Sequence, residues 1–310
     1  FTDVCDHNGQ VWSFGRNNSN QLGLGKASVE RSTTLIHKVE GLPAVRSVHC
    51  GFSFTVCLTN DETLWCFGSG ACRSSGEMFH PPVHLRGISA VKKVVCGRAH
   101  IVALTRERNV SVYGSNDENQ LGLGNTLVGG NRLVTETWTE LPLKEYIVDI
   151  ACGASHTIIL NEKGELYGVG ASAEQQLGFP AFVQRNPMPI KIPGLPPMKR
   201  ISCGYYHTMC IDSECQLWTF GRNSDGELGH GALTKQPPAI VPHIQGAMVL
   251  STGGQHTIVK GDQTFVFGNN SHGQLGMGTT YRFIADPVYI GDEFNDIVHK
   301  PVNPKKSARK

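Results

Sequence analysis

Histidine and cysteine are the residues of this chain best suited to chemistry, because they bind metals and act as bases or nucleophiles. Histidine recurs at equivalent places in four copies of an internal repeat: His100, His156, His207 and His256. Four imidazoles in register could form a metal site. However, Phe1 and Phe54 take the same place in the two other copies, and phenylalanine cannot replace a metal ligand. We therefore predict that each histidine is a packed ring with one hydrogen bond.

Cysteine is abundant, with ten residues in the chain. Four of them precede a glycine at one repeat position: Cys50, Cys96, Cys152 and Cys203. A small residue that is readily buried suits such a position, and no C-x-x-C pair is present to suggest structural zinc. We predict reduced, buried thiols, which are typical of a cytoplasmic or nuclear protein.

The sequence also lacks the motifs of conventional enzymes. It contains no G-x-S-x-G nucleophile elbow, no Walker loop and no H-E-x-x-H zinc motif. The acidic pairs Asp61-Glu62 and Asp117-Glu118 fall at expected turns, so we interpret them as solvated. We expect no catalytic residue, no metal and no other cofactor.

Glycines divide the chain into repeats of nearly fixed spacing. In four copies the glycine after the cysteine precedes a second glycine by 17 residues, as Gly153 precedes Gly170. In five copies a Leu-Gly glycine follows eight residues later, as Gly178 does. A period of about 50 residues made of short strands and glycine turns is typical of a β-propeller.

One copy illustrates the strands that each repeat should form. Asp149–Cys152 and His156–Leu160 are expected to be the first two strands, and Asn161–Gly164 a hairpin turn between the second and the third. Leu166–Gly170 and Asn186–Ile192 are expected to be the third and fourth strands. Six copies therefore predict an all-β fold with six blades of four antiparallel strands.

The two ends of the chain are expected to complete one blade together. Phe1–Gly15 aligns with His156–Gly170, so the chain enters at the second strand of a repeat. Pro287–His299 resembles Leu42–His49, which starts a repeat. Strands from both termini would then close one blade and remove the free sheet edges.

The length of the chain favours a single domain, and its small net charge does not favour nucleic-acid binding. We expect residues 1–300 to form a single propeller and the basic residues 301–310 to be a disordered tail or linker. The net charge is +2 and the pI about 8.1, so nucleic-acid binding is not expected. No apolar run is long enough to span a membrane. We expect a monomer, and because the chain starts with Phe, a piece of a longer protein.

At these residues the chain resembles the RCC1 family. The repeat C-G-x-x-H-T-x-x-L, followed by G-x-L-W-x-F-G and G-Q-L-G-x-G, covers essentially residues 1–300. The resemblance implies a β-propeller, usually of seven blades, whereas six copies are present here. Either the chain is a six-bladed variant, which the complementary ends favour, or a further repeat lies outside this sequence. The resemblance does not imply one function, because family members include an exchange factor for the GTPase Ran, plant photoreceptors and interaction domains of ubiquitin ligases and kinases.

Two departures from the family's exchange factor argue against that activity. The resemblance implies a β-wedge encoded by extra residues between the aromatic-Gly and Leu-Gly turns, but that interval is eight in five copies. It also implies acidic residues just before the repeat histidine, where this chain has pairs such as Arg98-Ala99 and Tyr205-Tyr206. Exchange on a Ran-, Rho- or Arf-like GTPase is therefore the alternative interpretation.

Partner-binding residues are sought where the repeats differ. The two positions after each glycine turn should face one mouth of the central channel, either as binding anchors or as the lining of a wet channel. They include Phe52, Arg98, Tyr205, Tyr206 and Gln255. Two irregular segments add Met78 and Phe79, and Phe179 and Phe182, as an apolar patch or as filler. We predict a non-enzymatic protein-protein interaction domain of a larger regulatory protein.

Overall fold

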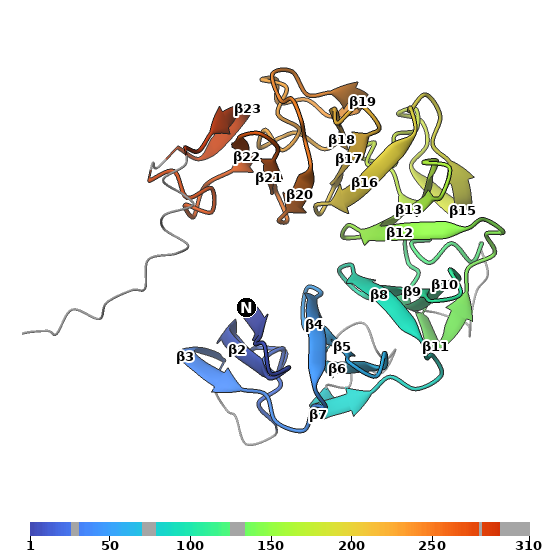
Figure 1. Cartoon of the computed structure of the whole chain (residues 1–310), viewed down its shortest axis with the longest axis vertical. Helices are drawn as coiled ribbons and strands as arrows, with labels where there is room; N and C mark the ends of the chain where they lie inside the picture. The colour runs from blue at the N-terminus through green and yellow to red at the C-terminus, as the bar shows by residue number, and fades with distance from the viewer. Residues whose placement is uncertain (26–30, 70–78, 125–133, 279–280, 292–310) are drawn as a thin grey trace, which may run out of the picture.

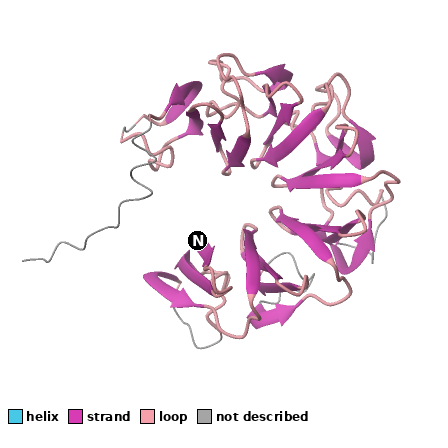
Figure 2. Ribbon diagram, viewed as in Figure 1, coloured by secondary structure: helices cyan, strands magenta, loops and turns pink. Residues whose placement is uncertain are grey.

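The computed structural model describes residues 1–25, 31–69, 79–124, 134–278 and 281–291. These residues form 23 strands in six antiparallel sheets, with no helix among them (Figure 2). The sheets follow one another around a central axis, and we call them blades 1 to 6 in chain order (Figure 1). The prediction of a six-bladed all-β propeller is therefore confirmed.

Each blade follows the chain from the axis outward. Blade 1 contains β1 (Thr2–Cys5), β2 (Val11–Arg16) and β3 (Ser32–Lys38). Blade 2 contains β4 (Val45–Cys50), β5 (Phe54–Thr59), β6 (Leu64–Gly68) and β7 (Phe79–His84). Blade 3 contains β8 (Val91–Cys96), β9 (His100–Thr105), β10 (Val110–Ser115) and β11 (Val134–Glu140).

The second half of the chain repeats the same order. Blade 4 contains β12 (Ile147–Cys152), β13 (His156–Asn161), β14 (Leu166–Ala171) and β15 (Arg185–Lys191). Blade 5 contains β16 (Met198–Cys203), β17 (His207–Asp212), β18 (Leu217–Gly221) and β19 (Gln236–Ile240). Blade 6 contains β20 (Val249–Thr252), β21 (His256–Lys260), β22 (Thr264–Asn269) and β23 (Phe283–Tyr289).

Blade 4 shows why the third strand of a repeat ends in glycine. β13 and β14 pair in register, with His156 opposite Gly170. The register between β14 and β15 shifts between Gly168 and Gly170. Gly170 has φ +102°, and a methyl group added there would lie 2.5 Å from the carbonyl oxygen of Ser155. Only glycine fits such a backbone, so this glycine is fixed by geometry.

The apolar core lies between neighbouring blades. Phe220 and Phe267, the residues before the third-strand glycine, are both fully buried. A methyl group added at Gly178 of blade 4 would lie 3.4 Å from Phe220 of blade 5, and one at Gly229 would lie 3.1 Å from Phe267 of blade 6. The Leu-Gly turn of one blade therefore receives the aromatic ring of the next, which confirms the predicted inter-blade packing.

Blade 1 is the blade that strands from both termini were predicted to complete. It has three described strands, and β1 is its innermost and contacts β4. Residues 287–289 belong to β23, the outer strand of blade 6. Pro287–His299 was expected to start a repeat, and this expectation is wrong for residues 287–289. Residues 292–310 lie outside the described residues, so closure of blade 1 by the C-terminus and the disordered tail remain predictions.

Blade 4 also lacks an anchor that four other blades share. In those blades an asparagine Oδ1 accepts the backbone N–H of the turn leucine at 2.9–3.2 Å: Asn17, Asn116, Asn223 and Asn270. Ser172 takes this place in blade 4, where it is fully buried and its hydroxyl has no partner among the described residues.

A Ser172→Asn variant should restore this anchor. One added buried hydrogen bond is expected to raise the free energy of unfolding by about 1 kcal/mol, measured by urea denaturation. Ser172→Ala, which adds no bond, is the matched control and should leave the stability nearly unchanged. A variant less stable than the wild type would show that the site is too small for the amide and contradict the prediction.

Candidate functional site

The repeated histidines join neighbouring blades. Nε2 of His156 lies 3.1 Å from the hydroxyl of Thr208 in blade 5, and that hydroxyl donates to the carbonyl oxygen of Gln176 at 2.7 Å. Because the threonine proton is used in this way, the imidazole Nε2–H is the donor to Thr208. His100 and His207 bond the threonine of the next blade similarly. The prediction of a packed ring with one hydrogen bond is confirmed for these three.

Burial keeps these imidazoles neutral. It lowers the pKa of His100, His156 and His207 to about 3. Each lies in a different blade, and within the described ranges no three His, Cys, Asp or Glu side chains are arranged to hold a metal ion. The histidines therefore hold the blades together.

The glycine after each cysteine makes room for this ring. A methyl group added at Gly153 would lie 1.9 Å from Cε1 of His156, and one at Gly51 would lie 2.1 Å from Phe54. The preceding cysteines line the axial channel, where Cys50 is exposed and Cys152 is half-buried. Cys96 and Cys203 are half-buried as well, so the prediction of buried thiols is wrong for Cys50 and only partly met at the other three copies of this position. All nine cysteines of the described residues are free thiols, as predicted.

The first position after each glycine turn lies at the channel mouth, as predicted. The backbone N–H of Arg98 donates to Ala154 and that of Ala154 to Tyr205, each at 2.9 Å, and Tyr205 donates to Gly254 at 2.8 Å. This relay fixes the turns of blades 3 to 6 around a channel of about 580 Å³. Phe52 and Tyr205 remain 51% and 44% exposed there.

Aromatic and cationic side chains stack on this face. The guanidinium of Arg98 lies 5.8 Å from the ring centre of Phe52. The rings of Tyr205 and Tyr206 meet edge to face at 6.4 Å, and the guanidinium of Arg222 lies 5.7 Å from the ring centre of Tyr206. Such contacts hold large side chains in place before binding, which reduces the entropy lost on association.

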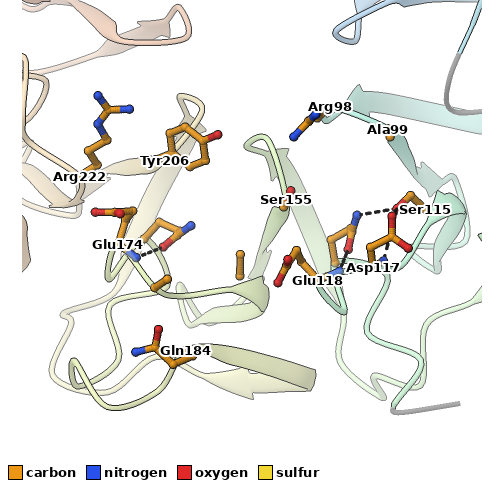
Figure 3. Close-up of a pocket in the computed structure, with 14 residues that line it drawn as sticks. Arg98, Ala99, Ser115, Asp117, Glu118, Ser155, Glu174, Gln184, Tyr206 and Arg222 are labelled. Carbon is orange, nitrogen blue, oxygen red and sulfur yellow. Dashed lines mark hydrogen bonds between the residues drawn. The ribbon is translucent and has the colours of Figure 1, made fainter. Parts of the chain in front are cut away.

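A pocket of about 740 Å³ lies beside the channel mouth, between blades 3, 4 and 5 (Figure 3). Small side chains leave the space: Ala99, Ser155, Ala171 and Ala173. In blade 5, Tyr206 and Arg222 stand at the repeat positions of Ser155 and Ala171. The pocket thus exists because blade 4 has small side chains at the two positions where blade 5 has large ones.

The pocket lining carries charged groups of both signs. Carboxylates come from Asp117, Glu118 and Glu174, and guanidiniums from Arg98 and Arg222. These polar groups point into a hollow large enough for side chains of another molecule.

A family model described as the RCC1-like domain matches residues 1–302 of this chain. The chain belongs to the RCC1-like family. It is 30% identical over 305 residues to the regulator of chromosome condensation of Mus musculus, covering 89% of this chain and 72% of that protein. It is 31% identical over 284 residues to the ultraviolet-B receptor UVR8 of Arabidopsis thaliana, covering 86% of this chain and 63% of that protein.

Solved structures support the RCC1-like fold. A chain in the crystal structure of Kap60 bound to yeast RCC1 (Prp20) has a TM-score of 0.81 at 18% identity, covering 93% of this chain and 72% of that chain. Human WBSCR16 has a TM-score of 0.79 at 22% identity, covering 94% and 79%. No helix able to cross a membrane occurs among the described residues.

The structure brings only some of the predicted residues of this RCC1-like propeller together. Arg98 and Tyr206 line the pocket, and Phe52, Arg98 and Tyr205 line the channel mouth. Gln255 is half-buried in the β20–β21 turn and is not among the lining residues of either hollow.

The two irregular segments contribute less than expected. Phe179 is only 8% exposed and packs in the core with Leu177 and Phe220, so of the two alternatives it is filler and not part of an apolar surface patch. Phe182 is 82% exposed. Phe79 opens β7 opposite Gly68, and Met78 lies outside the described residues.

The sequence interpretation missed four pocket residues that matter most: Ser155, Ala171, Glu174 and Arg222. Their signal was available in the repeat alignment. Ser155 and Ala171 are small where blade 5 has tyrosine and arginine, and such a difference between copies indicates a hollow.

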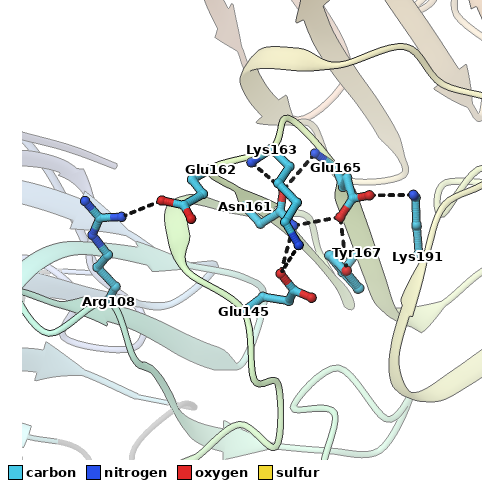
Figure 4. A network of polar contacts seen from close by, with 8 residues as sticks. All are labelled: Arg108, Glu145, Asn161, Glu162, Lys163, Glu165, Tyr167 and Lys191. Atoms are coloured by element: carbon cyan, nitrogen blue, oxygen red, sulfur yellow. Dashed lines mark hydrogen bonds and ion pairs between the residues drawn. The ribbon is translucent and has the colours of Figure 1, made fainter.

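Polar side chains also gather at the β13–β14 turn, at the other end of β13 (Figure 4). Oδ1 of Asn161 accepts the backbone N–H groups of Lys163 and Glu165 at 3.0 and 2.9 Å, and its Nδ2 donates to Glu165 and Glu145. These bonds shape a hairpin turn. Ion pairs around it are exposed and contribute little to stability, so we assign this network a structural role.

Proposed function

We propose that this RCC1-like propeller is a protein-protein interaction domain of a larger regulatory protein. It binds its partner through the face that carries the channel mouth and the pocket. The observation that carries the proposal is the pocket of about 740 Å³ next to the stacked side chains of Arg98 and Tyr206. Exposed aromatic residues and arginine beside a hollow are typical of binding hot spots.

A pull-down tests this proposal with a matched pair of variants. Arg98→Ala/Tyr205→Ala/Tyr206→Ala removes the anchors of the proposed face. Recovery of the partner should fall about tenfold or more, because hot-spot truncations typically cost about 2 kcal/mol or more. The control Glu162→Ala/Glu214→Ala changes turns at the opposite ends of the strands and should recover the partner normally. Equal recovery by a folded triple variant would refute this binding face.

Nucleotide exchange on a small GTPase is the second candidate function, and the similarity to the regulator of chromosome condensation favours it. The unextended interval of eight residues and the absence of acidic residues before the repeat histidines oppose it. We expect no faster release of a fluorescent nucleotide from Ran-, Rho- or Arf-like GTPases with substoichiometric protein. Catalytic release would replace our proposal by exchange. A cytoplasmic or nuclear location is part of the proposal.

A further inference from the structure

We propose that the pocket between blades 3, 4 and 5 binds the guanidinium group of an arginine presented by a partner protein. The inference rests on the proposed function, since it names the chemistry that this face recognises.

Blade 5 contains its own guanidinium at the corresponding place. Arg222 lies over the ring of Tyr206, and its nitrogens approach Oδ2 of Asp225 at 3.5 Å and Oε1 of Glu227 at 3.6 Å. The Glu227 side chain is nearly fully buried. The chain therefore shows, within itself, how this repeat position binds a guanidinium.

Blade 4 keeps one of the two acids of this arrangement and loses the cation, since Gln176 stands at the repeat position of Glu227. Ala171 stands at the repeat position of Arg222, and Glu174 at that of Asp225. Among the described residues, no ion pair or side-chain hydrogen bond involves the Glu174 carboxylate. A half-buried carboxylate beside a hollow thus lacks the cation that blade 5 supplies internally.

Blade 3 repeats the loss on the other side of the pocket. Ser115 replaces the arginine and Glu118 retains the acid. Glu118 makes only a long ion pair of 3.8 Å with Arg185, in which both side chains are about half exposed. The neighbouring Asp117 carboxylate accepts the hydroxyl of Ser115 at 3.0 Å and pairs with no cation among the described residues.

The three acidic residues are held in equivalent positions. One hydrogen bond runs in each blade from the backbone N–H of the acid to the side chain two residues later: Glu118 to Gln120 at 2.8 Å, Glu174 to Gln176 at 2.9 Å and Asp225 to Glu227 at 2.8 Å. Because this bond is the same in all three blades, the backbone at Glu118 and Glu174 is held as it is at Asp225.

The cations around the pocket are engaged elsewhere, apart from Arg185 in its long ion pair with Glu118. The pocket lining carries three carboxylates against two guanidiniums. Arg222 already pairs with Asp225 and Glu227, and Arg98 stacks on Phe52 at the rim. Lys235 donates to the carbonyl oxygen of Ala173 nearby, at 2.8 Å. A planar guanidinium, which bonds two acceptors at once, suits carboxylates spread across such a pocket.

A titration with a defined peptide tests the inference without the unknown partner. Acetyl-Gly-Arg-Gly-amide is added to isotope-labelled propeller, and the backbone signals of residues 171–176 are followed by NMR. The same peptide with citrulline, which keeps the shape but not the charge, is the matched ligand. We expect the arginine peptide to bind about tenfold or more tightly than the citrulline peptide, as for a charge-assisted pair. A third peptide carries lysine in place of the arginine, so that it keeps the charge but not the planar group. Binding of the citrulline peptide or of the lysine peptide as tight as that of the arginine peptide would overturn the inference.

Variants of the pocket acid locate the binding. Glu174→Gln should reduce the affinity for the arginine peptide to that for the citrulline peptide. Glu214→Gln, in the turn at the other end of blade 5, should leave it unchanged. The assignment to this pocket would be overturned if both variants lowered the affinity equally, or if neither variant changed it.

Ala171→Arg places the arginine of blade 5 into blade 4. The new guanidinium should occupy the pocket and lower the affinity for the arginine peptide about tenfold or more, with the fold retained. Undiminished peptide binding by the folded variant would overturn the inference. If the variant does not fold, the peptide affinity of Glu174→Gln is the deciding measurement.

The two proposals can fail separately. Suppose that the propeller recovers its partner through this face but does not bind the arginine peptide. That result would refute arginine recognition by the pocket and leave the proposed binding face intact. Peptide binding together with normal partner recovery by the triple anchor variant would refute the proposed binding face.

Discussion

Acidification from about pH 7.5 to about pH 5 is expected to lower the free energy of unfolding by about 6 kcal/mol. His100, His156 and His207 have pKa values lowered by burial from 6.5 to about 3. Between these values the unfolded chain binds protons that the folded chain excludes, so stability falls as the pH falls. Each histidine contributes about 2 kcal/mol over this interval.

Two further buried groups, Asp3 and His49, change the expected pH dependence of the free energy of unfolding. Asp3 stands where other repeats have an apolar residue such as Ile158, and burial raises its pKa to about 6. Its folded carboxyl takes up a proton as the pH falls and offsets about 1 kcal/mol. His49, whose pKa burial lowers to about 4, acts in the same direction as the buried histidines. Because domains are typically stable by about 5–15 kcal/mol, the propeller should be close to unfolding at about pH 5.

Urea denaturation at a series of pH values measures the effect, and His207→Phe is its matched control. Phe54 shows that a benzene ring fits this place in the repeat. The variant should lose about 2 kcal/mol of the pH dependence, while keeping most of its stability at neutral pH. An unchanged pH dependence in this variant would show that His207 is not buried as a neutral ring.

Gly153→Ala is expected to lower the free energy of unfolding by about 4 kcal/mol or to prevent folding. The added methyl group would lie 1.9 Å from Cε1 of His156 and 2.6 Å from the carbonyl oxygen of Gly204. Neither can yield easily, because the ring is held against Thr208 and the carbonyl belongs to the neighbouring blade. Core strain of this kind belongs to the largest single-residue effects.

Thermal and urea unfolding compare this variant with Gly291→Ala. At Gly291 the nearest atom to an added methyl group lies 3.6 Å away, and the glycine does not have the positive φ that strains other residues. We expect a change within about 0.5 kcal/mol there. A Gly153→Ala protein as stable as the control would contradict the close packing of the ring on this turn.

The fold could be predicted from sequence because the repeats sample the same geometry six times. Gly170 and Gly178 lie in phase with the glycines of other copies, and the strands of blade 4 begin and end within a few residues of the expected positions. The exchange of histidine for Phe54 between copies is enough to indicate a packed ring and not a metal ligand. The six copies within the chain can thus be compared with one another, and the comparison shows which residue types each position of the repeat accepts.

The site was less predictable because it depends on which side chains are small. Arg98 and Tyr206 were expected at the channel mouth, yet the hollow beside them comes from Ser155 and Ala171, which carry no chemical signal of their own. Phe179 looked like a surface aromatic, but the turn that precedes it points the ring into the core between blades 4 and 5. Such directions follow from packing, which the spacing of residues does not encode.

Hydrogen–deuterium exchange of the propeller, with and without the partner recovered in the pull-down, tests the proposed binding face most directly. We predict that binding slows exchange at the channel mouth, in residues 97–99, 153–155 and 204–206, and along the pocket in residues 171–176. Slower exchange confined to the turns at the opposite ends of the strands, in residues 106–109, 162–165 and 213–216, would contradict the account.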